Sequence, residues 1–131
     1  MGAHHARVLA ELPGARLAAV CDADREHGAE VAARHGCAFY DDYRALLSSV
    51  PLDVVIVAVP TRLHVEVACE AMRRGLHVLL EKPLACDEAG AREVVRCARL
   101  SGVKLMAGHI ERFNPAVERL KGLIEEGRFG E

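Results

Sequence analysis

The sequence lacks the features that mark several whole classes of protein. Its formal net charge is -2, so it offers no basic surface for nucleic acid or an anionic membrane. No apolar run is long enough to span a bilayer, and the first residues do not form a charged-then-apolar signal peptide. With 51% hydrophobic and 27% charged residues among 131, the composition predicts one soluble globular domain of ordinary size.

The cysteines form no pattern that would bind a metal or build disulfides. Their number, five, is odd, they are scattered, and no C-x-x-C pair occurs. We therefore expect reduced thiols in a cytoplasmic protein, with neither a disulfide framework nor a zinc site. The five are Cys21, Cys37, Cys69, Cys86 and Cys97.

Lysine is scarce, and one lysine stands out by its position. Lys82, Lys104 and Lys121 are the only lysines in a chain whose positive charge is otherwise arginine. Lys82 lies in the stretch VLLEKP, where an apolar run predicts a buried strand. Ligands of open α/β sheets bind at the carboxyl ends of strands, and a desolvated lysine can change its protonation state. Lys82 is therefore a candidate for proton chemistry; the alternative is a lysine that caps an exposed edge.

Strand and helix patterns alternate regularly along the chain. Apolar runs predict strands at 16–21, 38–40, 53–59, 77–80 and 103–107. Periodicity, capping residues and glycine stops predict helices at 6–12, 24–36, from 41 or 42 past 47, 63–74, 87–100 and 114–127. Because the strands have no polar face, we expect them to be buried on both sides. The pattern predicts an α/β fold with a doubly wound parallel sheet, Rossmann-like, in one domain over residues 1–131.

Two residues near the start match parts of a dinucleotide-binding unit. Asp22 ends a predicted strand about 20 residues after Gly2, the spacing of the acid that binds the ribose 2′-hydroxyl. Its charge would favour NAD over NADP. The alternative is that Asp22 only caps a turn, and the nearby Arg25 leaves NADP open. Of the G-x-G-x-x-G fingerprint only Gly2 is present, as its last glycine.

Polar residues also follow the strand predicted at 53–59. Pro60 ends this strand, Thr61 is expected to N-cap the next helix with its hydroxyl, and His64 follows in the first turn. His64 either binds a ligand or stabilises the loop, and we favour the loop role because side-chain caps are common at such turns.

A second polar group follows the strand predicted at 103–107 and should face the same edge as Lys82. It contains His109, Glu111, Arg112 and Asn114. Arg112 suits an anionic group such as a phosphate. The alternative is that Glu111 and Arg112 only pair at the surface and that Asn114 is only a helix cap. The other histidines near helices lack ligand spacing and are interpreted as surface residues: His4, His5, His27 and His35.

Together these segments resemble the Gfo/Idh/MocA oxidoreductase family. The matching stretches occur in the family's order and spacing and cover nearly the whole chain. The most specific part is a P-T-x-L-H element combined with E-K-P after the next strand. The last stretch is most similar to the branch that includes UDP-N-acetylglucosamine 3-dehydrogenases. The stretches are MGAHHARVLAELPG, AAVCDAD, VVIVAVPTRLH, HVLLEKPLA and GHIERFNPAV.

The resemblance implies an NAD- or NADP-binding Rossmann domain, a second domain for a sugar or nucleotide-sugar substrate, and a homo-oligomer. It implies hydride transfer from a carbinol to nicotinamide, with Lys82 as the catalytic residue that stabilises the alkoxide or relays its proton. Pro83 would shape the Lys82 backbone through a cis peptide. His109 and Arg112 are the candidates on the substrate side. The residues implied to bind the cofactor are Gly2, Asp22, Val59, Pro60, Thr61, His64, Glu81, Lys82 and Pro83.

Two parts of the family pattern are missing from the chain: the first strand with its G-x-G, and the C-terminal substrate domain. In the strand order 3-2-1-4-5-6 the first strand is central, so we expect unpaired inner edges on the strands at 16–21 and 54–59. Unpaired buried groups cost about 1–3 kcal/mol each, against a total domain stability of about 5–15 kcal/mol. We therefore expect an incomplete domain that is inactive as an isolated chain.

Two other functions stay open on the sequence. Some relatives of this family hydrolyse glycosides with the help of NAD, and because this domain is common to both reactions the chain does not separate them. The other function is that of a non-catalytic fragment that only binds, which the missing glycines suggest.

Overall fold

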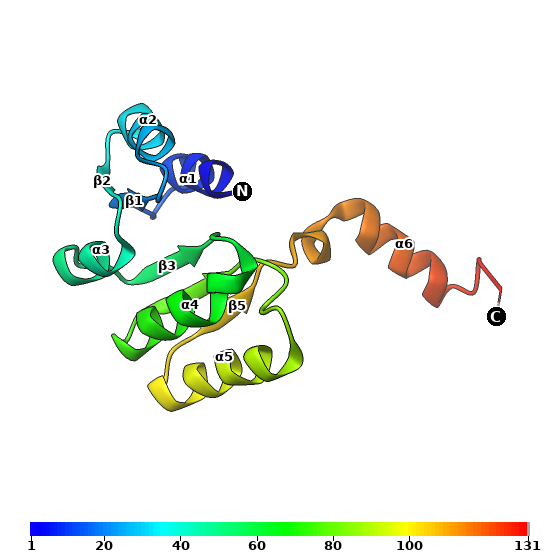
Figure 1. Cartoon of the computed structure of the whole chain (residues 1–131). Coiled ribbons are helices and arrows are strands. Elements are labelled where there is room, and N and C mark those ends of the chain that lie inside the picture. Colours follow the sequence, from blue (N-terminus) through cyan, green and yellow to red (C-terminus); the bar gives the residue numbers. More distant parts are fainter. Residues whose placement is uncertain (131) are drawn as a thin grey trace.

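The structure, a computed structural model, describes residues 1–130 as two small parallel sheets surrounded by helices (Figure 1). The strands are β1 Ala19–Cys21, β2 Ala38–Tyr40, β3 Val54–Val57, β4 His77–Leu80 and β5 Leu105–Ala107. The helices are α1 Gly2–Glu11, α2 Arg25–His35, α3 Tyr43–Ser49, α4 His64–Arg73, α5 Glu88–Ser101 and α6 Pro115–Glu125, with 3₁₀ turns η1 Thr61–Leu63 and η2 Ile110–Phe113. The predicted α/β fold with parallel strands is confirmed.

The strands form ladders in two separate groups. β1 pairs with β2, and β4 lies between β3 and β5 in a second sheet, all in parallel. Within residues 1–130 no ladder joins β1 to β3, so the inner edge of each strand lacks a β partner. This is the arrangement predicted for a Rossmann-like sheet without its central strand.

Helix ends follow the capping residues closely. The side chains of Asp24, Asp42, Asp87 and Asn114 each accept a backbone N–H in the first turn of the helix that they precede. The capping residues predicted at the starts of the helices at 24–36, 87–100 and 114–127 are confirmed, and of the two candidates at 41 and 42 it is Asp42 that caps. Each satisfies an amide that has no partner inside the helix, which is why short polar residues are found there.

The boundaries differ from the prediction where tertiary contacts decide them. α1 begins at Gly2, four residues before the predicted start, and β1 is shorter than the predicted strand at 16–21. β1 has a ladder on one side only, and β2 offers it just three partners. Thr61 does not cap α4 with its hydroxyl. The Leu63 amide donates to Pro60 O at 2.8 Å, which tightens this entry into the 3₁₀ turn η1.

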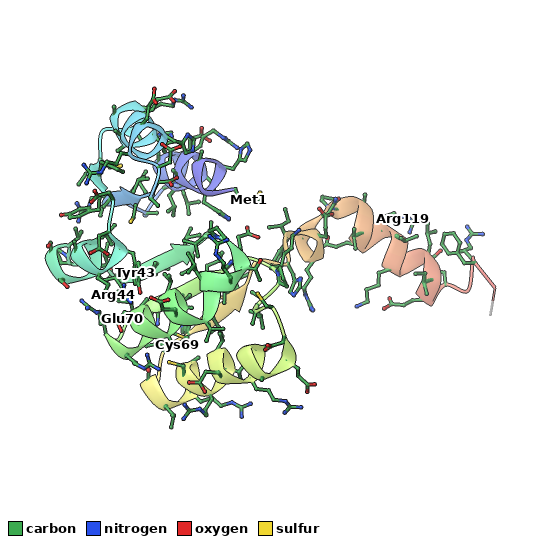
Figure 2. The ribbon with its side chains drawn as sticks, in the orientation of Figure 1. Met1, Tyr43, Arg44, Cys69, Glu70 and Arg119 are labelled. Atoms are coloured by element: carbon green, nitrogen blue, oxygen red, sulfur yellow. The ribbon has the colours of Figure 1, made fainter. Side chains whose placement is uncertain are left out.

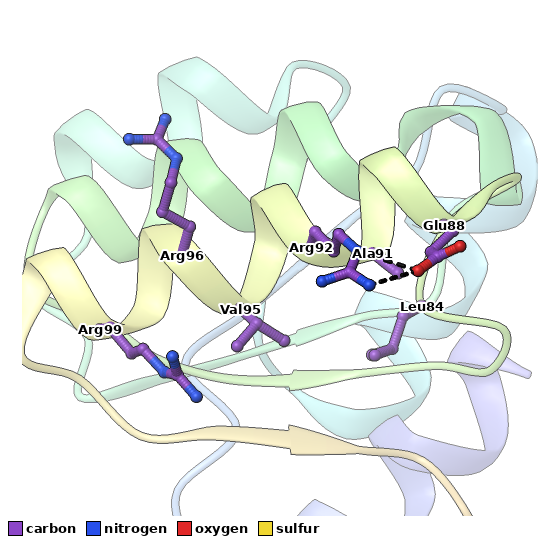
Figure 3. Close-up of a pocket in the computed structure, with 7 residues that line it drawn as sticks. All are labelled: Leu84, Glu88, Ala91, Arg92, Val95, Arg96 and Arg99. Atoms are coloured by element: carbon purple, nitrogen blue, oxygen red, sulfur yellow. Dashed lines mark hydrogen bonds and ion pairs between the residues drawn. The ribbon is translucent and has the colours of Figure 1, made fainter.

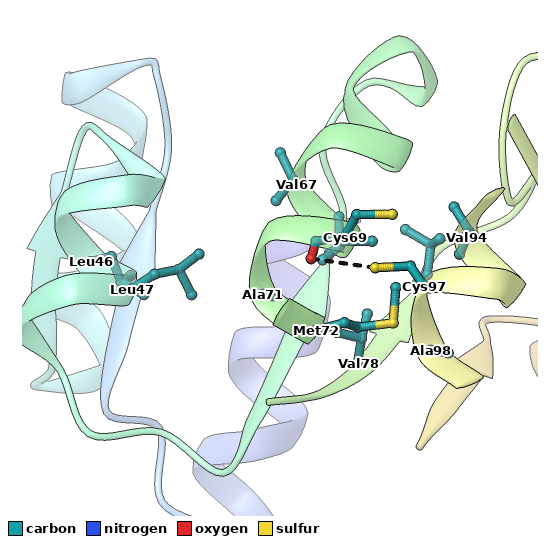
Figure 4. Close-up of a cluster of buried hydrophobic side chains, with 13 residues drawn as sticks. Leu46, Leu47, Val67, Cys69, Ala71, Met72, Val78, Val94, Cys97 and Ala98 are labelled. Atoms are coloured by element: carbon teal, nitrogen blue, oxygen red, sulfur yellow. Dashed lines mark hydrogen bonds between the residues drawn. The ribbon is translucent and has the colours of Figure 1, made fainter. Parts of the chain in front are cut away.

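The main core lies between the β3–β4–β5 sheet and the helices α4 and α5 (Figure 4). Leu80, Met72 and Val94 are fully buried there. Cys97 Sγ lies 3.6 Å from Cys69 O, and burial together with this neighbour raises the pKa of the Cys69 thiol to about 12. A thiol held protonated in this way is unreactive and serves as a small apolar side chain.

The opposite face of the same sheet is open, so the expectation that every strand is buried on both faces is wrong. Val54 is 52% exposed and Met106 47% exposed. Their strand neighbours Val55 and Leu105 pack against the core, as the alternation of side chains in a strand requires. The helices α4 and α5 both lie on the core side.

The periphery contains two further features. Tyr43 and Arg44 of α3, labelled in Figure 2, both donate hydrogen bonds to Glu66 of α4 and so join these helices at the surface. α6, which carries Arg119, leads away from the sheets (Figures 1 and 2).

Among residues 1–130, no helix is long and apolar enough to cross a membrane.

Candidate active site at the carboxyl ends of the strands

The ends of β3, β4 and β5 meet at one edge of their sheet, because the three strands are parallel. The Glu81 amide donates to Val57 O at 3.0 Å, and the Gly108 amide donates to Leu80 O at 2.8 Å. These two bonds continue the ladders one residue beyond the ends of β4 and β5. They hold the predicted groups around Pro60, Lys82 and His109 at a common edge.

Glu81 is the buried centre of this edge. Its Oε1 accepts a hydrogen bond from His5 Nε2 of α1 at 2.7 Å, and its Oε2 accepts the Lys82 amide at 3.1 Å. Burial alone would raise the pKa of the Glu81 carboxyl, but these two hydrogen bonds outweigh it and hold the pKa below its ordinary value. Because the pKa is lower in the folded chain, the carboxylate stabilises the fold above its ordinary titration range. That contribution is lost as the pH falls.

His5 is the site residue that the sequence interpretation missed. Predicted to be a surface residue, it has a half-buried side chain bonded to Glu81. The spacing along α1 gives no signal of this, because the partner lies 76 positions away. One signal was available: an acid that ends a buried strand requires a hydrogen-bond donor from elsewhere.

The turn after Glu81 is held from a second side by His64. The peptide between Lys82 and Pro83 is cis, as predicted. His64 is buried, with Nδ1 2.8 Å from Pro83 O and Nε2 2.9 Å from Val59 O. A carbonyl only accepts, so a ring with one N–H bonds one of these oxygens and a doubly protonated ring bonds both. Both ring nitrogens thus face carbonyl groups of the loop, in line with the loop role preferred for His64, and its role toward a cofactor stays a prediction.

Lys82 lines an open hollow of about 520 Å³ at the same edge. Next to it, the Glu111 carboxylate accepts from the Asn114 side-chain amide at 2.9 Å, and within residues 1–130 it forms no ion pair with Arg112. Arg112 is exposed. The surface pair offered as the alternative for Glu111 and Arg112 is therefore absent. The lining residues are Lys82, Gly108, His109, Ile110, Glu111 and Arg112.

A second hollow, of about 420 Å³, lies on the outer face of α5 (Figure 3). Val95 and Leu84 form its floor, and Arg92 is bonded there to Glu88. It contains no strand end and none of the candidate residues of the strand-end edge. Since ligands of doubly wound folds bind at the carboxyl ends of strands, the Lys82 hollow is the better candidate site.

The candidate ribose acid lies in the other sheet, at the carboxyl end of β1. Asp22 Oδ1 accepts the Asp24 amide at 3.0 Å, which leaves the second carboxylate oxygen for a ligand. Arg25, the cation because of which NADP stayed possible as the cofactor, forms an ion pair with Asp41. α1 has no side-chain cap, and a Cβ added at Gly2 would meet nothing within 4 Å. Open amides at a helix start suit a phosphate.

The absence of a zinc site, expected from the cysteine spacing, stays a prediction. Among residues 1–130 no three His, Cys, Asp or Glu side chains lie close enough together to hold a metal ion.

Gly108 provides a test of the packing around Glu81. A Cβ there would lie 3.2 Å from the Glu81 carboxyl and 3.3 Å from its Cα. We expect Gly108→Ala to destabilise the chain by about 1–3 kcal/mol through overpacking, measured by urea denaturation. Gly122→Ala, in α6 with only a flexible arginine within 4 Å, is the control and should stabilise by about 0.5–1 kcal/mol. A Gly108→Ala variant whose free energy of unfolding is unchanged would contradict this packing.

Comparison with known proteins agrees with the fold. The profile of the oxidoreductase family with an NAD-binding Rossmann fold, GFO_IDH_MocA, matches residues 1–109. Of solved structures, the WlbA dehydrogenase from Bordetella pertussis, in complex with NADH and UDP-GlcNAcA, superposes with a TM-score of 0.87. The two sequences are 29% identical over 97% of this chain and 37% of that one.

Curated relatives have three different activities. The chain is 37% identical to a 2,7-anhydro-N-acetylneuraminate hydratase of Mediterraneibacter gnavus (98% of this chain, 34% of the relative). It is 38% identical to an inositol 2-dehydrogenase of Streptomyces avermitilis (99% and 39%). It is 37% identical to a UDP-N-acetylglucosamine 3-dehydrogenase of Acidithiobacillus ferrooxidans (92% and 37%). The chain thus spans less than half the length of each relative. From residues 1–109 and this structural agreement, the chain belongs to the Gfo/Idh/MocA oxidoreductase family and represents its NAD-binding Rossmann domain.

Proposed function

We propose that this chain is the dinucleotide-binding part of a dehydrogenase that uses NAD to oxidise a carbinol of an anionic sugar or nucleotide sugar. The Glu81-Lys82-Pro83 turn carries the proposal. Its lysine lines the hollow at the carboxyl edge of β3, β4 and β5, where ligands of doubly wound sheets bind. The turn is held in place by two histidines from other elements, as a reacting group requires.

The described residues fit the cofactor at both of its ends. Asp22 keeps one carboxylate oxygen for the adenosine ribose, and the uncapped start of α1 at Gly2 suits the pyrophosphate. The nicotinamide would then lie toward the edge formed by Val59, Pro60 and Lys82. Glu81 would support this edge from beneath, because both of its carboxylate oxygens already accept hydrogen bonds from the protein.

Lys82 does the proton chemistry in this proposal. When bound, the nicotinamide accepts the hydride from the carbinol carbon. In the oxidation, the neutral Lys82 amine would accept the hydroxyl proton as the hydride leaves the carbinol carbon, and the resulting ammonium would donate a hydrogen bond to the oxygen. In the reverse reaction the Lys82 ammonium would return this proton to the oxygen. A lysine suits both tasks because, unlike arginine, it exchanges its proton readily when it is partly desolvated.

The charge of the hollow supports an anionic substrate. Lys82 and Arg112 are cationic and Glu111 is the one acid among the lining residues, so positive charge is in excess at the hollow. A guanidinium binds a carboxylate or phosphate with two parallel hydrogen bonds. UDP-N-acetylglucosamine and 2,7-anhydro-N-acetylneuraminate, named for two of the relatives, both carry such a group.

Turnover is best tested in a hybrid enzyme, because the proposed substrate domain has no counterpart among residues 1–131. In it, residues 2–130 replace the matching stretch of the Acidithiobacillus UDP-N-acetylglucosamine 3-dehydrogenase, whose own preceding and following segments are kept. We expect NADH to form when UDP-N-acetylglucosamine and NAD are added. Formation of a sugar product without net NADH would instead favour the glycoside hydrolase or hydratase alternative. No turnover in a folded hybrid that binds NADH would favour a binding remnant.

Cofactor choice gives a separate prediction in the same hybrid. Asp22→Asn should raise the dissociation constant for NADH about tenfold, because the charge-assisted bond to the ribose hydroxyl is weakened. Affinity for NADPH should rise or stay unchanged, because the repulsion of the 2′-phosphate is removed. Fluorescence titration measures both constants, and Asp53→Asn, an exposed aspartate ahead of β3, is the control. Equal losses for NADH and NADPH would refute the ribose role.

A further inference from the structure

The Glu81 carboxylate joins three elements that are far apart in the sequence. His5 lies in α1, 76 positions before Glu81, yet its Nε2 is 2.7 Å from Glu81 Oε1. The other oxygen, Oε2, accepts the Lys82 amide at 3.1 Å. Gly108 closes a third side, since a Cβ there would lie 3.2 Å from the carboxyl group. Glu81 is thus enclosed by α1, by the start of its own turn and by the end of β5.

Water competes little with these bonds. The exposed fraction of the side chain is 19% for His5 and 7% for Glu81. The charged or titratable groups that act on the carboxylate are His5 from α1 and Lys82 from its own turn. A hydrogen bond to a charged group in such surroundings is stronger than an exposed one, and a buried carboxylate oxygen left without a donor is costly.

An ionised carboxylate only accepts, so Glu81 holds its position through donors that other residues provide. If the His5 donor is removed, Oε1 has no partner in a buried place, and rotation of the carboxylate toward solvent relieves this. Such a rotation takes Oε2 away from the Lys82 amide. The position of the Lys82 backbone therefore depends on a histidine that does not touch it.

We propose that His5 is a positioning residue for Lys82, acting through Glu81 to fix the backbone of the Lys82 turn against α1. The functional meaning of this inference rests on the proposed role of Lys82 in hydride transfer. It connects the helix whose N-terminus is proposed to hold the cofactor phosphates with the lysine at the reacting end. The helix α1 and the Lys82 turn are then joined by the hydrogen bond between His5 Nε2 and Glu81 Oε1.

Amide hydrogen exchange on the ¹⁵N-labelled chain tests the positioning directly. His5→Leu removes the donor, His5→Gln keeps an N–H donor, and His4→Leu changes the exposed neighbour on the same helix. We expect the Lys82 amide to exchange about tenfold faster in His5→Leu, the effect of losing a bond to a charged group. Exchange in His5→Gln should return to within about threefold of the unsubstituted chain, and His4→Leu should leave it unchanged.

The amide of Leu80, in the centre of the sheet, reports unfolding of the whole core in the same spectra. If His5→Leu speeds exchange equally at Leu80 and Lys82, or leaves Lys82 unchanged, the positioning role is overturned. Titration of the hybrid enzyme with NADH separates this result from the proposed function. If exchange of the Lys82 amide depends on His5 but the folded hybrid does not bind NADH, the positioning is supported and the proposed function is contradicted. If NADH binds but exchange of the Lys82 amide is unchanged in His5→Leu, the proposed function is supported and the positioning role is overturned.

Discussion

Lys82→Ala is expected to lower kcat of the hybrid enzyme about a thousandfold, the range typical for loss of a group that stabilises developing charge or transfers a proton. NADH affinity should stay within about threefold, because Lys82 acts on the carbinol oxygen and not on the adenosine or phosphate parts of the cofactor. Lys82 is exposed at the hollow, so its removal leaves no buried cavity and should not unfold the domain. Steady-state kinetics and fluorescence titration measure the two quantities.

Two further substitutions separate charge from proton transfer. Lys82→Arg keeps a cation at the site but removes a readily exchanged proton, so it should restore only a small part of the lost rate. Lys104→Ala, at the amino end of the neighbouring strand β5, removes an exposed lysine from the opposite edge of the sheet and should leave kcat unchanged. If Lys82→Ala and Lys104→Ala have equal effects, Lys82 has no role in the reaction.

Adding one strand is expected to be the largest stabilising change available to the chain. The inner edges of β1 and β3 lack a ladder partner, and one parallel strand between them would satisfy both. We expect an extension of about five or six β-branched residues and a G-x-G turn, fused ahead of Met1, to raise the free energy of unfolding by several kcal/mol. Each buried backbone group that gains a partner contributes about 1–3 kcal/mol. Urea denaturation measures the change, and native mass spectrometry checks that the chain stays monomeric.

The control for this extension has the same length and apolar content, with proline at alternate positions. Proline has no N–H and cannot complete a central ladder, so this version should give little stabilisation. Equal stabilisation by the two extensions would mean that they only cover apolar surface. If the chain without an extension already unfolds cooperatively, and the first extension does not raise its free energy of unfolding, the claim that the inner edges of β1 and β3 lack partners is contradicted.

The fold was predictable where local chemistry decides it. Asp24, Asp42, Asp87 and Asn114 cap their helices as predicted, because a short polar side chain satisfies its own neighbours' amides wherever the chain goes next. The strands His77–Leu80 and Ala38–Tyr40 were predicted to the residue, because each is a short run that follows a glycine stop and ends at a charged residue. The edge that carries Lys82 follows from the first of these strands.

One error has a local cause: the Thr61 cap failed because the entry to α4 tightens into a 3₁₀ turn, which the residue type does not reveal. The other errors lie where distant contacts decide the outcome. The open face at Val54 and Met106 depends on which helices cover the sheet, a tertiary property. His5 could not be identified by spacing because its partner Glu81 belongs to another element. The roles of the candidate cofactor and substrate residues stay predictions.

The placement of Lys82 beside the nicotinamide is decided by a titration of NADH into the ¹⁵N-labelled chain that carries the added strand. We expect saturable shifts of the amides at Gly2, Asp22 and Lys82, which trace the cofactor from phosphates and ribose to the reacting edge. The amides of Arg92 and Arg96 on the outer face of α5 should not move. Shifts confined to that α5 face, or no saturable shift at Lys82, would contradict this placement.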